Sequence, residues 1–202
     1  MTVFRDITFL ATGPASECKR SAQRRVSAVA IEELVAFIPP PATPIDGEGD
    51  WSVAEGEFGI AFPADFKQLI RRYGTGRFYG DLRVANPLQP WGRDLIRDDL
   101  ARYGELRDAC EMSLKLFPES PGLLPWGGDS NGHLYCWWTE GPPHSWPVVQ
   151  VFHGYEEEIE PVPGPITSFL VRFISNEYPN MLGGNPFSVE DHYFEQGIPW
   201  LK

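Results

Sequence analysis

The sequence predicts a single α+β domain in which an antiparallel or mixed sheet carries helices mainly on one side. Helical patterns come first along the chain, strand-like segments follow, and another helical pattern comes near the end, without alternation of strands and helices. The length of 202 residues and the apolar fraction of 42% suit one domain with a sizeable core. The 20 glycines and 20 prolines indicate many turns and short elements.

The helices are predicted from apolar side chains at helical spacing and from the residues that bound them. Asp50 is a typical N-cap, and Gly59 and Gly74 are typical C-terminal stops. Pro63 stands where the first turn of a helix tolerates proline. Gly104 weakens the middle of the longest helix by roughly 1 kcal/mol relative to alanine. The predicted helices cover residues 25–38, 51–58, 63–73, 93–117 and 165–175.

The strands are predicted from short apolar and β-branched runs at residues 78–85, 123–126, 133–139 and 146–153. The Asn131-Gly132 pair between two of these runs is a strong hairpin signal. Trp137 and Trp138 are neighbours on one strand, so their side chains must point to opposite faces of the sheet. We expect one of them in the core and the other exposed or covered by helices.

The two ends of the chain are expected to lie outside the domain, which we place at residues 25–178. The first 25 residues carry a net charge of +3 and lack clear apolar periodicity. Residues 1–24 are therefore expected to be a flexible segment or upstream sequence from a misplaced start. Residues 179–202 are rich in glycine, proline and aromatic residues and are expected to form a C-terminal extension.

Negative charge is concentrated in the second part of the chain. The net charge is −11, and from Glu119 to the end eleven acidic residues face only Arg172 and Lys202, which leaves −2 for the first 118 residues. Such a surface repels phosphate and disfavours nucleic-acid binding. It suits a basic protein partner, although acidic surfaces also simply keep proteins in solution.

The cysteine and hydropathy patterns predict a cytoplasmic protein. Cys18, Cys110 and Cys136 are odd in number and form no C-x-x-C motif, so a disulfide framework is not expected. No apolar run approaches the ~20 residues that cross a bilayer.

No residue pattern predicts a metal site. Asp129, Asn131 and Glu140 stand at the first, third and twelfth positions of a calcium loop, but Gly132 stands at position four instead of six. Four possible zinc ligands near the hairpin match no zinc spacing and differ in strand phase. These four residues are His133, Cys136, His144 and His153.

No pattern predicts a catalytic residue or a cofactor either. The glycines at 74, 76 and 80 follow a helix and lack the spacing of a dinucleotide loop. There is no G-x-S-x-G motif, and no serine has an evident His and Asp partner. Neighbouring carboxylates in the acidic stretch point to opposite faces of a strand, so they do not converge as an acid–base pair. We expect this stretch to contact a partner through Glu156, Glu157, Glu158 and Glu160. Trp137 and Trp138 are the other two candidate contacts.

Two blocks of the sequence resemble the SUKH superfamily, which includes fungal Smi/Knr-type cell-wall regulators and bacterial immunity proteins of polymorphic toxin systems. The resemblance covers residues 25–178, and Phe62-Pro63 departs mildly from it because Leu-Pro is commoner there. The first block is Trp51, Glu55, Phe58, Gly59, Phe62, Pro63, Asp65, Phe66, Lys67, Ile70, Tyr73, Gly74 and Gly76. The second is Leu124, Pro125, Trp126, Gly127, Gly128, Asp129, Gly132, Tyr135 and Trp137.

The resemblance implies an α+β fold and protein binding without enzymatic activity. It implies an immunity protein that blocks a toxin by occlusion, with a regulatory adaptor that has no toxin partner as the alternative. The residues of the first block also have a structural explanation, because their spacing buries aromatic side chains against a sheet. Glu55 is expected either to cap a backbone group or to pair with a cation.

Overall fold

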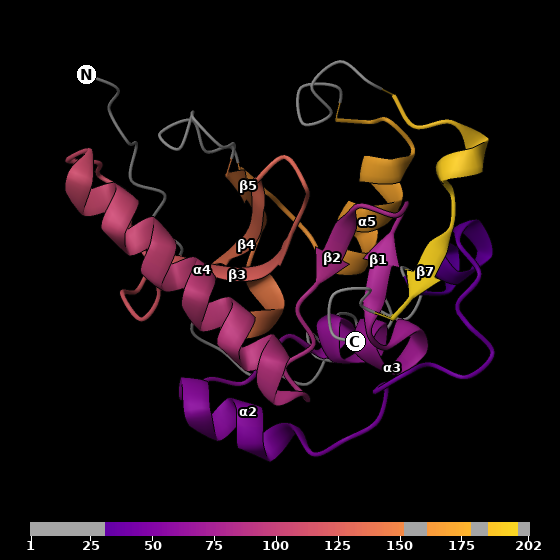
Figure 1. The fold of residues 1–202 in the computed structure, drawn as a ribbon, viewed down its shortest axis with the longest axis horizontal. Helices are drawn as coiled ribbons and strands as arrows, with labels where there is room; N and C mark the ends of the chain where they lie inside the picture. The colour runs from indigo at the N-terminus through magenta and orange to yellow at the C-terminus, as the bar shows by residue number, and fades with distance from the viewer. Residues whose placement is uncertain (1–30, 152–160, 179–185, 198–202) are drawn as a thin grey trace, which may run out of the picture.

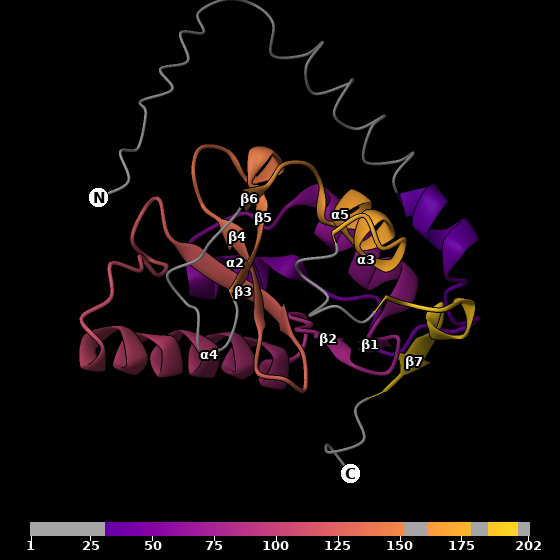
Figure 2. The ribbon, with the colours of Figure 1, turned by 90° about the horizontal axis from the view of Figure 1, so that it is seen from above.

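The computed structural model describes residues 31–151, 161–178 and 186–197. The strands in these three segments form one open sheet (Figures 1 and 2). Its strand order is β6-β5-β4-β3-β2-β1-β7, and each neighbouring pair is antiparallel. The predicted α+β class is therefore confirmed. The strands are β1 Gly76–Phe78, β2 Leu82–Val84, β3 Leu123–Gly128, β4 Leu134–Trp138, β5 Val148–Val151, β6 Pro161–Val162 and β7 Phe194–Gln196.

The helices begin and end largely where the sequence places their caps. Asp50 accepts a hydrogen bond from the backbone N–H of Ser52 at 2.9 Å, and Gly59 ends the same helix in the left-handed conformation. Residues 31–37 are also helical, and no described helix is both long and apolar enough to cross a membrane. The labelled helices are α2 Trp51–Phe58, α3 Ala64–Tyr73, α4 Pro90–Ala109 and α5 Ile166–Ile174.

The longest helix ends eight residues before the predicted position. Helix α4 stops at Ala109, and Glu111 then has a positive φ of 52°, which a continuing helix does not allow. Leu114 and Phe117 continue the apolar spacing of the helix, but Leu114 packs from a segment without regular structure and Phe117 from a turn. The prediction of a helix through residue 117 is therefore wrong, because periodicity alone did not register the turn.

The predicted strand at residues 78–85 is a hairpin. Tyr79 and Gly80 both have positive φ, and they reverse the chain between β1 and β2. Phe78 pairs with Leu82, and Arg77 pairs with Arg83. The result is two short strands in place of one.

The two faces of the sheet support separate apolar clusters. Tyr135 and Trp137 alternate along β4 with Leu134 and Cys136, so the two pairs face opposite sides. The first face packs against α3, α5 and residues 31–38, and helix α4 lies across the second face (Figure 2). Helices therefore lie mainly on one side, as predicted, with α4 as the exception.

The predicted C-terminal extension contributes an edge strand. Strand β7 pairs with β1, and Phe194 contacts the rings of Tyr73 and Phe78 at centroid distances of 5.2 and 5.0 Å. The sheet therefore continues beyond the domain boundary that we placed at residue 178.

Candidate protein-binding surface

Glu55 and Lys67 stabilise the connection between α2 and α3. The Glu55 Oε1 atom accepts the backbone N–H of Phe62 at 2.9 Å and lies 2.6 Å from Lys67 Nζ. Lys67 Nζ also lies 5.3 Å from the centroid of the Trp51 ring, within the range of a cation–π contact. Glu55 thus performs both roles that the sequence suggested, and both are structural.

Replacing Glu55 with alanine is expected to lower the free energy of unfolding by about 1–2 kcal/mol, because the buried N–H of Phe62 loses its acceptor. Urea unfolding measures this loss. The matched control is Glu33→Ala on the exposed side of the first helix. Equal losses for the two variants would show that the Glu55 hydrogen bond contributes nothing specific.

Most of the remaining signature also serves the fold. Phe66 packs edge-on against Trp137 at a centroid distance of 4.8 Å, and the Tyr73 hydroxyl donates to the carbonyl of Ile38 at 2.7 Å. A Cβ on Gly74 would lie 2.1 Å from the carbonyl oxygen of Ile45, so only glycine fits there. Gly76 is equally crowded, since its Cβ would lie 2.3 Å from the carbonyl oxygen of Glu195. Phe58 packs at the border of the core, and Pro63 stands at the N-cap of α3.

Asp129 organises the turn of the central hairpin. Its Oδ1 accepts the backbone N–H groups of Asn131 and His133 at 3.0 Å each. Its Oδ2 lies 3.0 Å from His133 Nδ1 and accepts the Tyr135 hydroxyl at 3.2 Å. Gly132 completes the turn with a φ of 85°. The Asn-Gly turn is therefore confirmed, and its aspartate is a hub of local hydrogen bonds.

The hydroxyl of Tyr135 links this turn to the neighbouring strand. Gln150 Nε2 donates to the Tyr135 oxygen at 3.1 Å while the hydroxyl donates to Asp129. Burial raises the pKa of Tyr135 well above its usual range, and Tyr79 and Asp129 raise it further. Tyr135 therefore stays protonated and keeps its donor role.

Of the residues that we expected to contact a partner, the structure describes the two tryptophans but not the four glutamates. Trp137 is 1% exposed in the first apolar cluster, so its side chain is not at the surface. Trp138 is half-buried on the second face, against the second cluster. The four glutamates at residues 156–158 and 160 lie outside the described residues, and their role stays a prediction. Within the described part of the chain, no three His, Cys, Asp or Glu side chains gather as metal ligands.

A line of charged side chains crosses the second face of β7, β1 and β2 and was not anticipated. Glu195 pairs in register with Arg77, Arg77 with Arg83, and Arg83 with Gly128 on the next strand. Arg77 Nη2 lies 2.5 Å from Glu195 Oε2. A Cβ on Gly128 would lie 3.2 Å from Arg83 Nη2, so this glycine makes room for the guanidinium.

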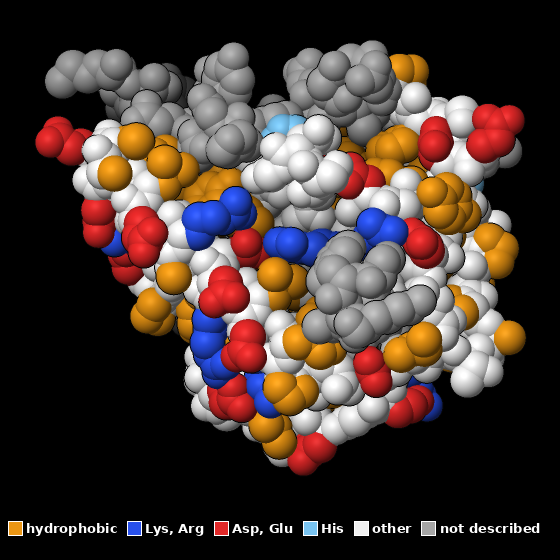
Figure 3. All heavy atoms as spheres, in the orientation of Figure 1, with side chains coloured by type: hydrophobic (Ala, Val, Ile, Leu, Met, Phe, Trp, Pro, Cys, Tyr) orange, Lys and Arg blue, Asp and Glu red, His pale blue; other side chains and the backbone are white. Residues whose placement is uncertain are grey.

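Helix α4 extends this line with a buried carboxylate and a further arginine. Asp99 Oδ2 lies 3.2 Å from Arg83 Nη2, and Asp99 Oδ1 lies 3.1 Å from Arg102 Nη2. The Asp99 side chain is 8% exposed, and its burial raises its pKa, an effect that the two guanidiniums oppose. We call Arg77, Arg83, Arg102, Asp99 and Glu195 the arginine row, and Figure 3 shows blue side chains aligned across this face.

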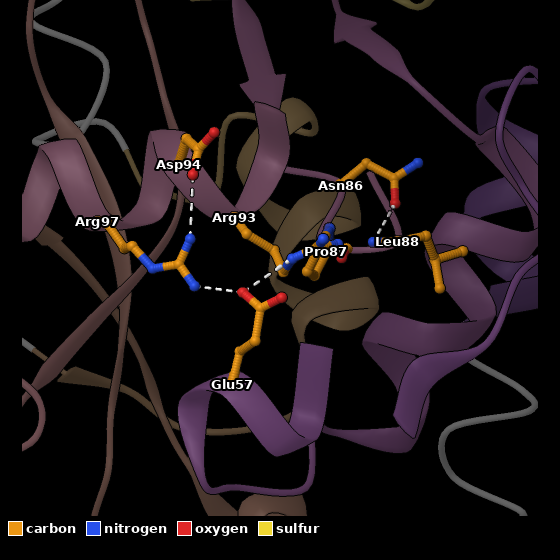
Figure 4. A network of polar contacts seen from close by, with 7 residues as sticks. All are labelled: Glu57, Asn86, Pro87, Leu88, Arg93, Asp94 and Arg97. Carbon is orange, nitrogen blue, oxygen red and sulfur yellow. Dashed lines mark hydrogen bonds and ion pairs between the residues drawn. The ribbon is translucent and has the colours of Figure 1, made fainter. Parts of the chain in front are cut away.

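A second charged cluster joins α2 to α4 and has balanced charges (Figure 4). Arg93 Nε lies 3.1 Å from Glu57 Oε2, and Arg93 Nη1 donates to the carbonyl of Pro87 at 2.9 Å. Arg97 contacts the same Glu57 oxygen and lies 3.0 Å from Asp94 Oδ1. Hydrogen bonding with Arg97 holds the pKa of Glu57 below its usual range, with Arg93 adding to the effect. The cluster contains two cations, Arg93 and Arg97, and two anions, Glu57 and Asp94, and it stabilises the contact between α2 and α4.

The open antiparallel sheet, the helical cover and a signature that serves packing define an α+β domain. The profile of the SMI1-KNR4 cell-wall family, SUKH_6, matches residues 48–170, which is more than half of the chain. The chain therefore belongs to this family of the SUKH superfamily. No significant match was found among curated proteins or among solved structures.

Proposed function

We propose that this chain is a non-enzymatic protein-binding module, and specifically an immunity protein that neutralises a partner toxin by occlusion. Membership of the SUKH superfamily carries this proposal. The described signature residues support it, because Glu55, Phe66 and Tyr73 fill packing and capping roles and Asp129 orders a turn. Binding specificity then rests on the surface of the domain.

The charge distribution supports a basic partner. The segment from Glu119 to Lys202 carries eleven acidic residues against two basic ones, a net charge of −9. A field of this sign attracts a basic domain and raises the rate of productive encounter. The acidic stretch at residues 156–160 is the proposed centre of that contact.

A second candidate function is a regulatory adaptor without a toxin partner. The family description, which refers to the SMI1-KNR4 cell-wall proteins, favours it. The adaptor would use the same fold, and its partner would be a cellular protein.

Co-expression with a candidate toxin separates the two functions. A suitable candidate is the C-terminal domain of a large secreted protein, if one is encoded immediately upstream of this chain. We expect the two chains to purify together and the host cells to survive. Host death together with failure to purify as a complex would contradict the immunity function and leave the adaptor function as the stronger one.

The co-expression needs a control for indirect protection. The toxin with an inactivated catalytic residue is co-expressed with the chain, and the complex is purified again. Occlusion requires that the inactive toxin still binds. Protection without any complex would show that the chain acts on something other than the toxin.

A further inference from the structure

The arginine row places two positive charges directly opposite each other. Arg77 and Arg83 are register partners on adjacent strands, where directly opposed Cβ atoms lie about 4.5–5.5 Å apart and like charges destabilise the pairing. Glu195 and Asp99 reduce this repulsion. On the α4 side of the row, Arg83 and Arg102 nevertheless share one carboxylate, Asp99, among the described residues, so these two guanidiniums carry an excess of one positive charge.

The ion pairs in the row use few of the available donors. Arg83 and Arg102 each contact Asp99 through a single terminal nitrogen among the described residues, at 3.2 and 3.1 Å. A guanidinium has five N–H donors arranged to bind a carboxylate in a bidentate manner. The side chains of Arg83 and Arg102 are 28% and 52% exposed, so an incoming group can reach them. The balanced cluster around Glu57 has no such excess of charge.

We infer that the arginine row is a docking site for an aspartate or glutamate side chain of a protein partner. A carboxylate offers one negative charge to one excess positive charge and matches the geometry of the guanidinium. A polyanion such as nucleic acid fits less well, since Asp99 and Glu195 lie within the row and the chain carries a net charge of −11.

This site deepens the proposed function by determining the orientation of the partner. It rests on that function only in requiring a protein partner. An acidic chain attracts a basic surface over a long range without selecting one orientation. A positive site on a chain with net negative charge accepts only the part of the partner that presents a carboxylate, and such complementarity fixes register.

Nuclear magnetic resonance of the full-length ¹⁵N-labelled chain tests the site without a toxin. The probe is the blocked peptide acetyl-Gly-Glu-Gly-Glu-Gly-amide, and the matched control peptide has glutamine in place of glutamate. We expect saturable shifts of the Arg83 and Arg102 Nε–Hε signals with a dissociation constant on the order of millimolar. The glutamine peptide is expected to cause no saturable shift.

Two variants show whether the arginines themselves bind. Arg102→Gln removes an exposed charge from the row, and we expect it to weaken peptide binding by about tenfold. The control Arg72→Gln removes an exposed arginine that pairs with Glu32 on another part of the chain, and binding should stay unchanged. Both replaced side chains are about half exposed, so both variants are expected to fold.

Three results would overturn the site: no saturable shift with the glutamate peptide, the same shifts with the glutamine peptide, or equal binding by Arg102→Gln and the wild-type chain. Saturation by inorganic phosphate at lower concentrations than by the peptide would assign the row to phosphate groups instead. A failed titration with a successful toxin co-purification would reject this site and leave the immunity function intact. The reverse outcome would reject the toxin and keep the carboxylate site.

Discussion

Replacing Trp137 with alanine is expected to lower the free energy of unfolding by about 3–5 kcal/mol, the range for removing a fully buried large aromatic side chain. Trp137 is 1% exposed and packs against Phe66, Trp126 and Trp146, with ring centroids at 4.8, 6.2 and 6.3 Å. Its loss leaves a cavity that rigid neighbours cannot fill. Urea unfolding followed by far-ultraviolet circular dichroism measures the change.

The adjacent residue provides the matched control. Trp138→Ala removes the same side chain from the other face of β4, where it is half-buried, and should cost less than about 2 kcal/mol. A loss below ~1 kcal/mol for Trp137→Ala would place that ring at the surface. Trp137 would then return to the set of partner contacts that the sequence suggested.

Reversing Glu156, Glu157 and Glu158 to lysine is expected to slow association with the cognate toxin by roughly one to three decades at low salt. The change moves the net charge from −11 to −5 and removes the concentrated negative charge that attracts a basic domain. Wild-type association should also slow as salt rises, because the Debye length falls from ~30 Å at 0.01 M to ~8 Å at 0.15 M. Stopped-flow binding across a salt series measures both effects.

A second triple reversal separates local from overall charge. Glu33, Asp98 and Glu105 are exposed on helices, and reversing them to lysine changes the net charge by the same six units. This control should slow association less than the reversal at residues 156–158. Circular dichroism confirms that both variants fold. If the folded triple reversal at 156–158 binds and protects as well as the wild type, the acidic stretch serves only solubility.

Features set by nearby residues could be predicted from the sequence. The Asp50 cap, the Gly59 and Gly74 stops and the Asn131-Gly132 turn depend on conformational preferences within a few residues, and the structure contains all of them. The alternation of Trp137 and Trp138 across the sheet also follows from strand geometry alone. Which of the two enters the core depends on where the helices pack, and the residue pattern of β4 does not contain that information.

Features set by distant pairing could not be predicted. Arg77 and Glu195 are 118 residues apart, and only the pairing of β1 with β7 brings them together. Asp99 falls within the helix predicted at residues 93–117, where its sequence neighbours give no sign that it is buried between Arg83 and Arg102. The arginine row therefore has no local signal in the sequence. The end of α4 was missed for a different reason, since Leu114 and Phe117 keep helical spacing after the helix has ended.

The position of β7 determines how the chain can be shortened without harm. A polypeptide cut at residue 170, where the family match ends, would lose β7 and part of α5. Strand β1 would then become the margin of the sheet, and the rings of Tyr73 and Phe78 would lose the cover of Phe194. An exposed edge strand with apolar side chains can pair with the same strand of another molecule. Such a fragment would tend to aggregate, so residues 186–197 belong in any version of the chain used for biochemistry.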